Sequence, residues 1–129
     1  MRISKVDQVI EDERGSITQV VSFGKWKQLN LFSRKQSSLG GGHYHKKTRE
    51  FFYLIDGQAS VKIASIRDGI ISSHVFKSGD CFEMQPFEQH YFKFLSDTCF
   101  IALYSTIFNK DKPDVYVADT LPSLKDVFR

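Results

Sequence analysis

Two histidines and a glutamate lie close together near the middle of the chain, and all three residue types can bind a metal ion. His43 and His45 are separated by one residue, and Glu50 follows five residues after His45. In an extended strand, residues i and i+2 point to the same side with their backbones about 6.5–7 Å apart, so both imidazoles can reach one ion. Two histidines and one carboxylate form a ligand set typical of first-row transition metals.

His90 is a fourth candidate ligand, at the start of the segment His90-Tyr91-Phe92-Lys93-Phe94. On a strand it shares one face with Phe92 and Phe94, which predicts that its ring points into the interior, where it needs a polar partner. A single inward histidine is more often a hydrogen-bonded core residue, and an HxH pair alone is a weak signal. The combination of four residues favours a metal site. His74 stands alone on its strand and is expected to face solvent.

Short apolar segments bounded by Gly, Asp, Ser or Pro recur along the chain and predict strands. Asp56-Gly57 and Asp68-Gly69 are two-residue hairpin signals, and the content of 12 Phe and 5 Tyr favours a packed β-structure over a helix bundle. About nine strands at this spacing predict an antiparallel, all-β sandwich or barrel. The expected strands are Val6–Ile10, Ser16–Ser22, Lys25–Ser33, Phe51–Ile55, Ser60–Ile66, Ile70–Phe76, Cys81–Met84, His90–Leu95 and Phe100–Phe108.

Length and composition bound the remaining possibilities. A chain of 129 residues with 41% hydrophobic and 26% charged residues predicts one globular domain over residues 1–129, with a short helix or a tail at 119–129. The net charge of +3 is scattered along the chain, so we expect no nucleic-acid partner. No apolar run approaches the ~20 residues of a membrane helix, and no signal peptide is evident, so we expect a cytoplasmic protein without a membrane partner. Cys81 and Cys99 lack a CxxC spacing and are expected to be buried free thiols.

Two motifs resemble those of the cupin superfamily. His43–Gly57 is similar to the first cupin motif, HxH-x4-E-x6-G, and Gly79-x10-His90 is similar to the second. This resemblance implies a cupin double-stranded β-helix, which is a jelly-roll barrel, with one divalent transition metal inside. We expect zinc, with manganese, iron or nickel as alternatives that the same ligand set accepts. The ligands that the resemblance implies are His43, His45, Glu50 and His90.

A closer resemblance covers nearly the whole chain. It rests on Asp12-Glu13-Arg14-Gly15-Ser16, Gly42-His43-Tyr44-His45 and the segment from Ile107 to Tyr116, which ends in Pro113-Asp114-Val115-Tyr116. The chain resembles the C-terminal cupin domain of capsular-polysaccharide assembling enzymes, which epimerise a nucleotide-linked 4-keto sugar. Its start is also similar to deoxythymidine-diphosphate-sugar 3,5-epimerases. The resemblance implies a nucleotide-sugar substrate whose ketone a metal polarises, so that a base can move the adjacent proton. Candidates for the base are Tyr104, Tyr91 and Lys47.

Two alternatives remain open. The stretch around His43 is also similar to nucleotide-sugar 3,4-ketoisomerases, in which the two histidines act as acid and base without a metal, although their usual arginine is replaced here by Gly40. A non-catalytic cupin that binds a small molecule is the other alternative. In either case, exposed strand edges and outward aromatic residues such as Phe51 and Tyr53 lead us to expect a homodimer.

Overall fold

The structure is a computed structural model that describes residues 1–129. It contains eleven strands and one four-residue helix, in agreement with the all-β prediction. No helix has the length and apolar character needed to cross a bilayer. The elements are β1 (Arg2–Ser4), β2 (Gln8–Asp12), β3 (Gly15–Gln19), β4 (Gln28–Arg34), β5 (Leu39–His43), β6 (Glu50–Asp56), β7 (Gln58–Ser65), β8 (Ile71–Lys77), β9 (Cys81–Met84), β10 (Glu88–Phe94), β11 (Thr98–Tyr104) and α1 (Leu124–Val127).

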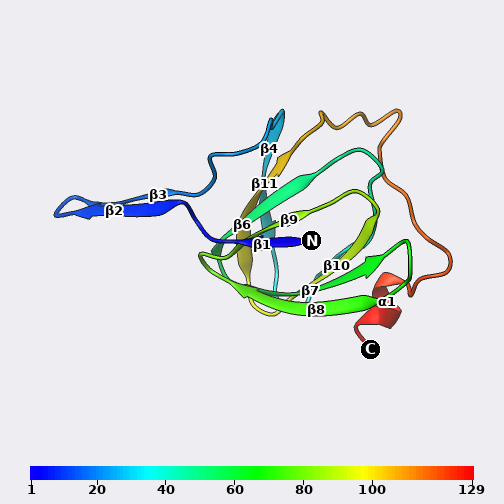
Figure 1. The fold of residues 1–129 in the computed structure, drawn as a ribbon. Coiled ribbons are helices and arrows are strands. Elements are labelled where there is room, and N and C mark those ends of the chain that lie inside the picture. Colours follow the sequence, from blue (N-terminus) through cyan, green and yellow to red (C-terminus); the bar gives the residue numbers. More distant parts are fainter.

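Two antiparallel sheets face each other and enclose the core (Figure 1). One sheet has five strands in the order β1-β9-β6-β11-β4, and the other has four in the order β5-β10-β7-β8. Strands distant in sequence are therefore neighbours, which is the arrangement of a jelly-roll barrel. The antiparallel double-sheet fold predicted from the sequence is confirmed.

The core between the sheets is largely aromatic. Phe82 stacks on Phe76 with ring centroids 4.1 Å apart, and Phe92 lies nearly parallel to Phe100. Inward side chains alternate with outward ones along each strand, so the apolar residues of both sheets meet in one cluster. The buried members of this cluster are Phe52, Leu54, Ala59, Val61, Ile63, Phe76, Phe82, Met84, Phe92, Phe94, Phe100 and Ala102.

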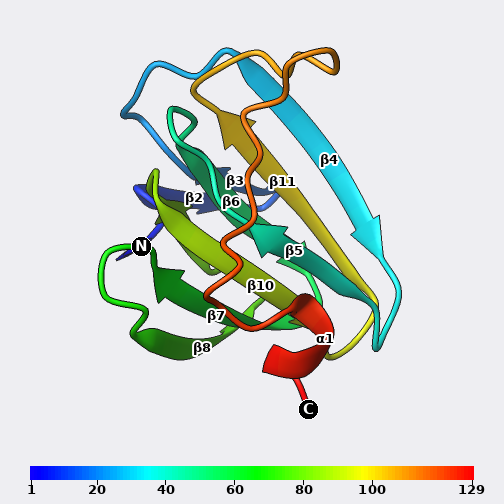
Figure 2. The same cartoon turned by 90° about the vertical axis from the view of Figure 1, so that its right-hand side faces the viewer.

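Some strand boundaries differ from those predicted. Of the expected strands, Cys81–Met84 has its predicted bounds. Strands β1 and β5 were not predicted; β5 contains three consecutive glycines, which have low strand propensity. Strand β11 ends at Tyr104 rather than Phe108 because the chain leaves the sheet there and crosses the open end of the barrel, shown in orange in Figure 2. The expected helix at the C-terminus is α1, capped by the Ser123 side chain.

Phe51 does not face solvent as the sequence suggested. It is 1% exposed, because Phe23 and Trp26, in the segment before β4, pack their rings against it. Arg49 lies over the Trp26 ring and pairs with buried Glu83, which fastens this aromatic cover to the sheet. The expectation of an outward Phe51 was therefore wrong, because the segment before β4 covers that face of the sheet.

The two cysteines and His74 differ in part from what the sequence predicted. Both cysteines are free thiols as expected, but only Cys81 is fully buried. His74 is half-buried and stacks on Phe76, with ring centroids 5.9 Å apart, instead of facing solvent freely. It lies on the same strand face as Phe76, at the edge of the four-stranded sheet.

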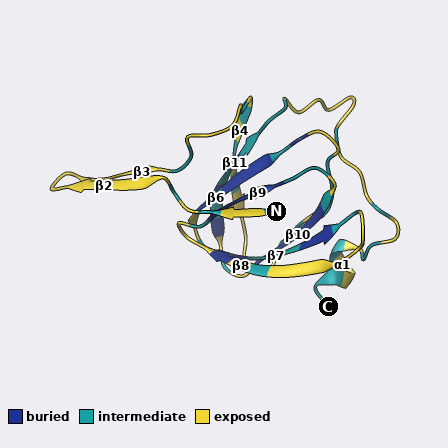
Figure 3. Cartoon of the chain, viewed as in Figure 1, coloured by how far each residue is buried: buried dark blue, intermediate teal, exposed yellow.

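Strands β2 and β3 form a hairpin that projects from the barrel (Figure 3). Every residue of both strands is exposed, including the apolar side chains of Val9, Ile10 and Ile17. Ile10 and Ile17 are cross-strand partners on one face of the hairpin. The hairpin therefore has no core of its own and pairs with neither sheet.

Candidate functional site

Three histidines meet at one end of the barrel. One ring nitrogen from each of His43, His45 and His90 lies within 4.8 Å of the others. The β-ladder explains part of this geometry, because His90 on β10 is the direct partner of His43 on β5, with ring centroids 4.7 Å apart. His45 follows two residues after the end of β5, where Tyr44 pairs with Tyr116. The inward orientation predicted for His90 is confirmed, since it is only 2% exposed.

Glu50, the first residue of β6, completes the cluster. Its Oε1 lies 2.5 Å from His45 Nε2 and 3.6 Å from His90 Nε2. The carboxylate thus faces His45 and His90. His45 Nε2 and Glu50 Oε1 are buried and do not have the geometry of a hydrogen bond to each other or to any other group. The structure brings together all four residues singled out from the sequence.

The outer nitrogens of two imidazoles are held by main-chain carbonyl groups. His45 Nδ1 lies 2.5 Å from the carbonyl oxygen of Asp114, and His90 Nδ1 lies 3.3 Å from that of Glu88. A carbonyl only accepts, so each Nδ1 carries the proton and donates it. In the neutral form of each ring, the Nε2 lone pair then faces the cluster interior, which is the tautomer that metal-binding histidines usually have.

The electrostatic environment keeps part of the cluster neutral. Burial, reinforced by the neighbouring imidazoles of His90 and His45, lowers the pKa of His43 to about 4, and burial also lowers the pKa of His90. Burial alone would lower the pKa of His45, but the adjacent Glu50 carboxylate outweighs it and raises that pKa. The pKa of Glu50 is lowered because the three imidazoles outweigh the effect of its burial. Two neutral imidazoles and an ionised carboxylate are therefore available at neutral pH.

The depressed pKa of His43 predicts a loss of stability in acid. A histidine whose pKa is lower in the folded than in the unfolded state destabilises the fold as pH falls from its ordinary 6.5 toward about 4. In chelator-treated protein, we expect the free energy of unfolding to drop by roughly 2 kcal/mol between pH 7 and pH ~4.5 on account of His43. Urea unfolding of the native chain and of His43→Gln measures this. A decline of the same size in both proteins would contradict the prediction.

Gly41 allows β5 and β10 to approach closely beside the histidine pair. It has φ +82°, and a Cβ at this position would lie 2.5 Å from the carbonyl oxygen of His90. We expect Gly41→Ala to destabilise the protein by about 2 kcal/mol or more, since it combines backbone strain with a clash against main chain. Gly40→Ala is the matched control, because its nearest contact would be an ordinary 3.6 Å to Phe94. Thermal unfolding compares the two variants, and equal melting temperatures would contradict this explanation.

Asp114 fixes the loop that carries the first histidine motif. Its carboxylate accepts hydrogen bonds from the backbone N–H groups of Lys46, Lys47 and Thr48, at 2.8–3.0 Å, and from the Thr48 hydroxyl at 3.0 Å. Although partial burial opposes it, these donors lower the pKa of Asp114 to about 2. Thr48 also pairs with the hydroxyl of Thr106. Asp114 therefore orients the His45 ring through its main-chain carbonyl, and it orients the loop of residues 46–48 through its side chain.

Sequence reasoning did not identify this role of Asp114. Asp114 entered only as part of a stretch of family resemblance, because it lies 66–69 residues from the groups that it binds and forms no local pattern with them. The only feature of the sequence that pointed to Asp114 was its position next to Pro113 in that stretch.

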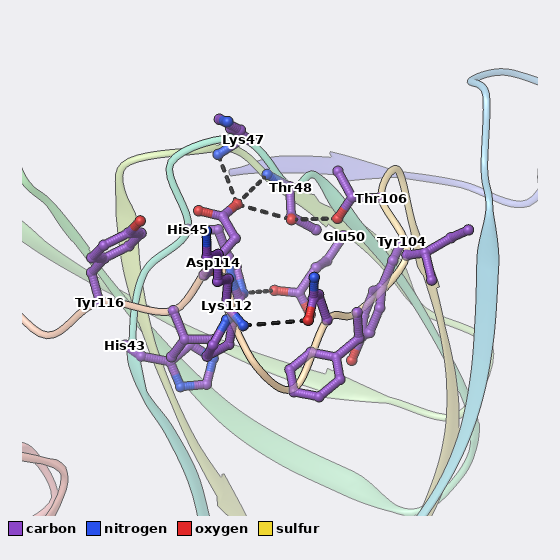
Figure 4. A pocket seen from close by; sticks show the side chains of 15 residues that line it. His43, His45, Lys47, Thr48, Glu50, Tyr104, Thr106, Lys112, Asp114 and Tyr116 are labelled. Carbon is purple, nitrogen blue, oxygen red and sulfur yellow. Dashed lines mark hydrogen bonds and ion pairs between the residues drawn. The ribbon is translucent and has the colours of Figure 1, made fainter.

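A cavity of about 480 Å³ opens above the cluster (Figure 4). Its wall includes His43, His45 and Glu50 together with most of residues 106–116. Tyr104 and Lys47, two of the three base candidates, also line it. Tyr91 does not, because its hydroxyl accepts a hydrogen bond from Gln89 and donates one to the Pro122 carbonyl on the other face of β10.

Tyr104 is the base candidate that pairs across strands with the residue carrying the carboxylate. It is the cross-strand partner of Glu50 in the β6–β11 ladder, so the two side chains share the inward face. Burial and the Glu50 charge raise the pKa of its hydroxyl, which therefore stays protonated at neutral pH. Tyr104, His43 and Glu50 also line a second, smaller cavity of about 140 Å³ inside the barrel, whose wall includes five phenylalanines.

The facing antiparallel sheets and the histidine cluster between them define a cupin barrel. The chain belongs to the family of polysaccharide biosynthesis C-terminal domains, whose family model matches residues 10–116. No curated protein sequence matches the chain significantly.

Solved structures share this fold. The capsular polysaccharide assembling protein CapF from Staphylococcus aureus is 22% identical with a TM-score of 0.67, over 85% of this chain and 32% of CapF. The present chain thus spans about a third of CapF. QdtA, a sugar 3,4-ketoisomerase from Thermoanaerobacterium thermosaccharolyticum in complex with TDP, is 16% identical with a TM-score of 0.73, over 92% of this chain and 88% of QdtA. The dTDP-4-dehydrorhamnose 3,5-epimerase from Sulfolobus tokodaii is also 16% identical, with a TM-score of 0.71 over 91% and 86% of the chains. The resemblance inferred from the sequence motifs is confirmed.

Proposed function

We propose that this protein moves a proton next to the ketone of a nucleotide-linked 4-keto sugar, as an epimerase or isomerase of polysaccharide biosynthesis. The observation that carries the proposal is a cluster of three imidazoles, two of which, from His43 and His45, line one cavity of about 480 Å³ together with Glu50 and Tyr104. The family assignment and the similarity to sugar epimerases and ketoisomerases support it. A cytoplasmic location is part of this proposal.

The residues present fit a divalent metal ion. His45 Nε2 and Glu50 Oε1 are buried, face each other and lack hydrogen-bond partners, which is the arrangement that a shared cation satisfies. Nitrogen and carboxylate ligands in this mixture suit zinc, with manganese, iron or nickel as alternatives. The residues that would hold the ion are His43, His45, Glu50 and His90. When bound, such an ion polarises a carbonyl oxygen and makes the adjacent C–H more acidic.

The chain itself supplies orientation and a proton donor. In this proposal Lys47, the other base candidate on the cavity, takes the C–H proton, and the electrons delocalise into the ketone. Returning a proton to the opposite face of the same carbon gives the epimer. Protonation of the former ketone carbon, with loss of the proton of the neighbouring hydroxyl, gives an isomer. Tyr104 remains protonated and lies beside Glu50, so in this proposal it returns the proton. We expect Tyr104→Phe to lower turnover roughly a hundredfold with the metal content unchanged. Turnover close to that of the native protein would exclude this role for Tyr104.

Proton exchange in heavy water tests the proposed reaction. The protein is incubated with nucleotide-linked 4-keto-6-deoxy sugars, and NMR follows deuterium entering the carbon next to the ketone. We expect exchange with at least one member of the panel. Ligand binding without exchange across the panel would instead identify a non-catalytic binding protein.

A metal-free 3,4-ketoisomerase is the second candidate. It is favoured by the position of His43, whose neutral imidazole lines both cavities. The Glu50 carboxylate beside His45 raises the pKa of that second imidazole, which suits it to hold and donate a proton. Metal analysis and product identification separate the candidates. Full activity in protein stripped of metal, with the ketone moved to the neighbouring carbon, would select the ketoisomerase.

We also propose that the protein is a homodimer. A two-stranded hairpin is marginally stable alone, yet β2 and β3 expose Ile10 and Ile17 without contact to either sheet. The edge strand β4 likewise exposes Leu29 and Leu31 next to an unpaired main-chain edge. If the β2–β3 hairpin of one copy packed against the β4 edge of another, the exposed apolar side chains of the hairpin and of β4 would both be covered. Light scattering after size exclusion tests this, and a monomer at micromolar concentration would contradict it.

A further inference from the structure

Strand β4 places two amide side chains on its inward face. Gln28 and Asn30 are half-buried and share that face with Phe32, which packs against the core. Leu29 and Leu31 point the other way and are exposed. Amides on the inward face of a strand and leucines on its outward face are the reverse of the pattern that burial of apolar groups favours. Packing therefore does not account for the two amides.

Both amides lie across from the end of β11 that carries Tyr104. In the β4–β11 ladder, Gln28 is the direct partner of Tyr104, and Asn30 pairs with Ala102 two residues earlier. Diagonal neighbours on two paired strands are within reach of an aromatic side chain. The Asn30 amide accordingly forms a hydrogen bond with the Tyr104 hydroxyl.

The hydrogen bonds of the two amides fix which end of each faces which partner. The backbone N–H of Phe108 donates to Gln28 Oε1 at 2.9 Å, so the NH2 group of Gln28 is the end that faces Asn30. That NH2 group donates to Asn30 Oδ1 at 3.1 Å. Since the oxygen of Asn30 is engaged, its NH2 group is the end that faces Tyr104. An amide NH2 group only donates, so the Tyr104 oxygen accepts this hydrogen bond.

The direction of the Tyr104 hydroxyl hydrogen follows from this order of donors. A hydroxyl carries one hydrogen and can rotate it toward either side when both sides offer an acceptor. Asn30 offers Tyr104 a donor and no acceptor, so the hydrogen points away from β4. Tyr104 lines both cavities beside the histidine cluster, and its hydrogen is therefore directed toward the space that they occupy.

We infer that Gln28 and Asn30 are positioning residues for Tyr104, because their amides direct the hydrogen of its hydroxyl into the cavity. This role rests on the proposed function, in which Tyr104 returns a proton to the sugar. A donor already aimed at the reacting atom needs no reorganisation when the proton moves. The amides also join Tyr104 to the segment of residues 106–116 that walls the cavity, through the N–H of Phe108.

The Asn30→Asp variant tests this role, because a carboxylate of the same size still accepts from Gln28 but cannot donate to Tyr104. The hydroxyl is then expected to turn and donate to the carboxylate. We expect kcat for deuterium exchange into the sugar to fall about a hundredfold, as in Tyr104→Phe, with KM changed less than about threefold and the metal content unchanged. Gln28→Glu keeps the acceptor for Phe108 and loses the donor to Asn30, so its kcat should fall only about threefold to tenfold. Gln36→Glu is the matched control, since it makes the same change of group at an exposed position after β4.

A double variant separates action through Tyr104 from an independent structural effect or a direct contact with substrate. In the Tyr104→Phe background, Asn30→Asp should lower kcat no further, because the hydroxyl on which it acts is absent. Effects of the two substitutions that multiply would overturn the inference. An unchanged kcat in Asn30→Asp, or an equal loss in Gln36→Glu, would overturn it as well.

Neutron diffraction from crystals of the full chain, exchanged into heavy water, tests the orientation without any substrate. We expect the deuterium on the Tyr104 oxygen to point into the cavity in the native chain and toward the introduced carboxylate in Asn30→Asp. A deuterium that points at Asn30 in the native chain would overturn the inference. The expected orientation in a native protein that catalyses no exchange would support the positioning role and refute the proposed reaction alone.

Discussion

The His45→Ala variant is expected to bind zinc at least a hundredfold more weakly than the native protein. The substitution removes one imidazole of the three-histidine group and leaves Glu50 Oε1 buried without the group that it faces at 2.5 Å. Loss of a ligand exceeds the tenfold to hundredfold effects typical of residues that only orient ligands. Competition with a chromophoric chelator measures the affinity, and elemental analysis of the purified variant measures occupancy.

A histidine outside the cluster provides the control. His74 lies on β8, half-buried against Phe76, and His74→Ala removes an imidazole without touching the site. We expect its zinc affinity to equal that of the native chain. Full metal occupancy in His45→Ala, or an equal loss in both variants, would overturn the assignment of His45 as a ligand.

The second large effect is expected for Asp114→Ala. Without the carboxylate, three backbone N–H groups of residues 46–48 lose their acceptor and the loop beside His45 is released. Hydrogen bonds to a charged group each contribute about 1.5–3 kcal/mol, so we expect a loss of stability of at least about 2 kcal/mol. Because the Asp114 carbonyl also orients His45, zinc affinity should fall roughly tenfold to a hundredfold.

A conservative variant and a neighbouring one separate this role from a general effect of charge. Asp114→Asn retains one acceptor oxygen and should fall between the native protein and Asp114→Ala in both stability and zinc affinity. Asp111→Ala removes an exposed carboxylate of the same segment whose side chain accepts no hydrogen bond, and it should behave like the native chain. Native stability and zinc affinity in Asp114→Ala would show that the carboxylate does not hold the site.

Local patterns predicted the fold class and the four clustered residues, but not how they meet. Alternation along β10 indicated that His90 faces inward, and the spacing of His43 and His45 indicated that both reach one point. The cross-strand pairing of His90 with His43 depends on the order of strands in the sheet, which no local spacing contains. The position of Glu50 against His45 and His90, instead of His43, likewise depends on the order of strands and not on local spacing.

The expectations that failed involve contacts between distant segments. Phe51 has the sequence environment of an outward strand residue, and only the packing of Phe23 and Trp26 buries it. Asp114 forms hydrogen bonds with residues almost 70 positions earlier in the chain. It lies in a segment without regular structure. Such contacts follow from the tertiary path of the chain across the end of the barrel.

Anomalous diffraction from crystals grown with zinc, recorded on both sides of the metal absorption edge, tests the central claim most directly. We predict one strong peak in the barrel, within bonding distance of nitrogens from His43, His45 and His90 and of a Glu50 oxygen. A barrel without such a peak, or zinc bound only at other residues, would contradict the proposed metal centre.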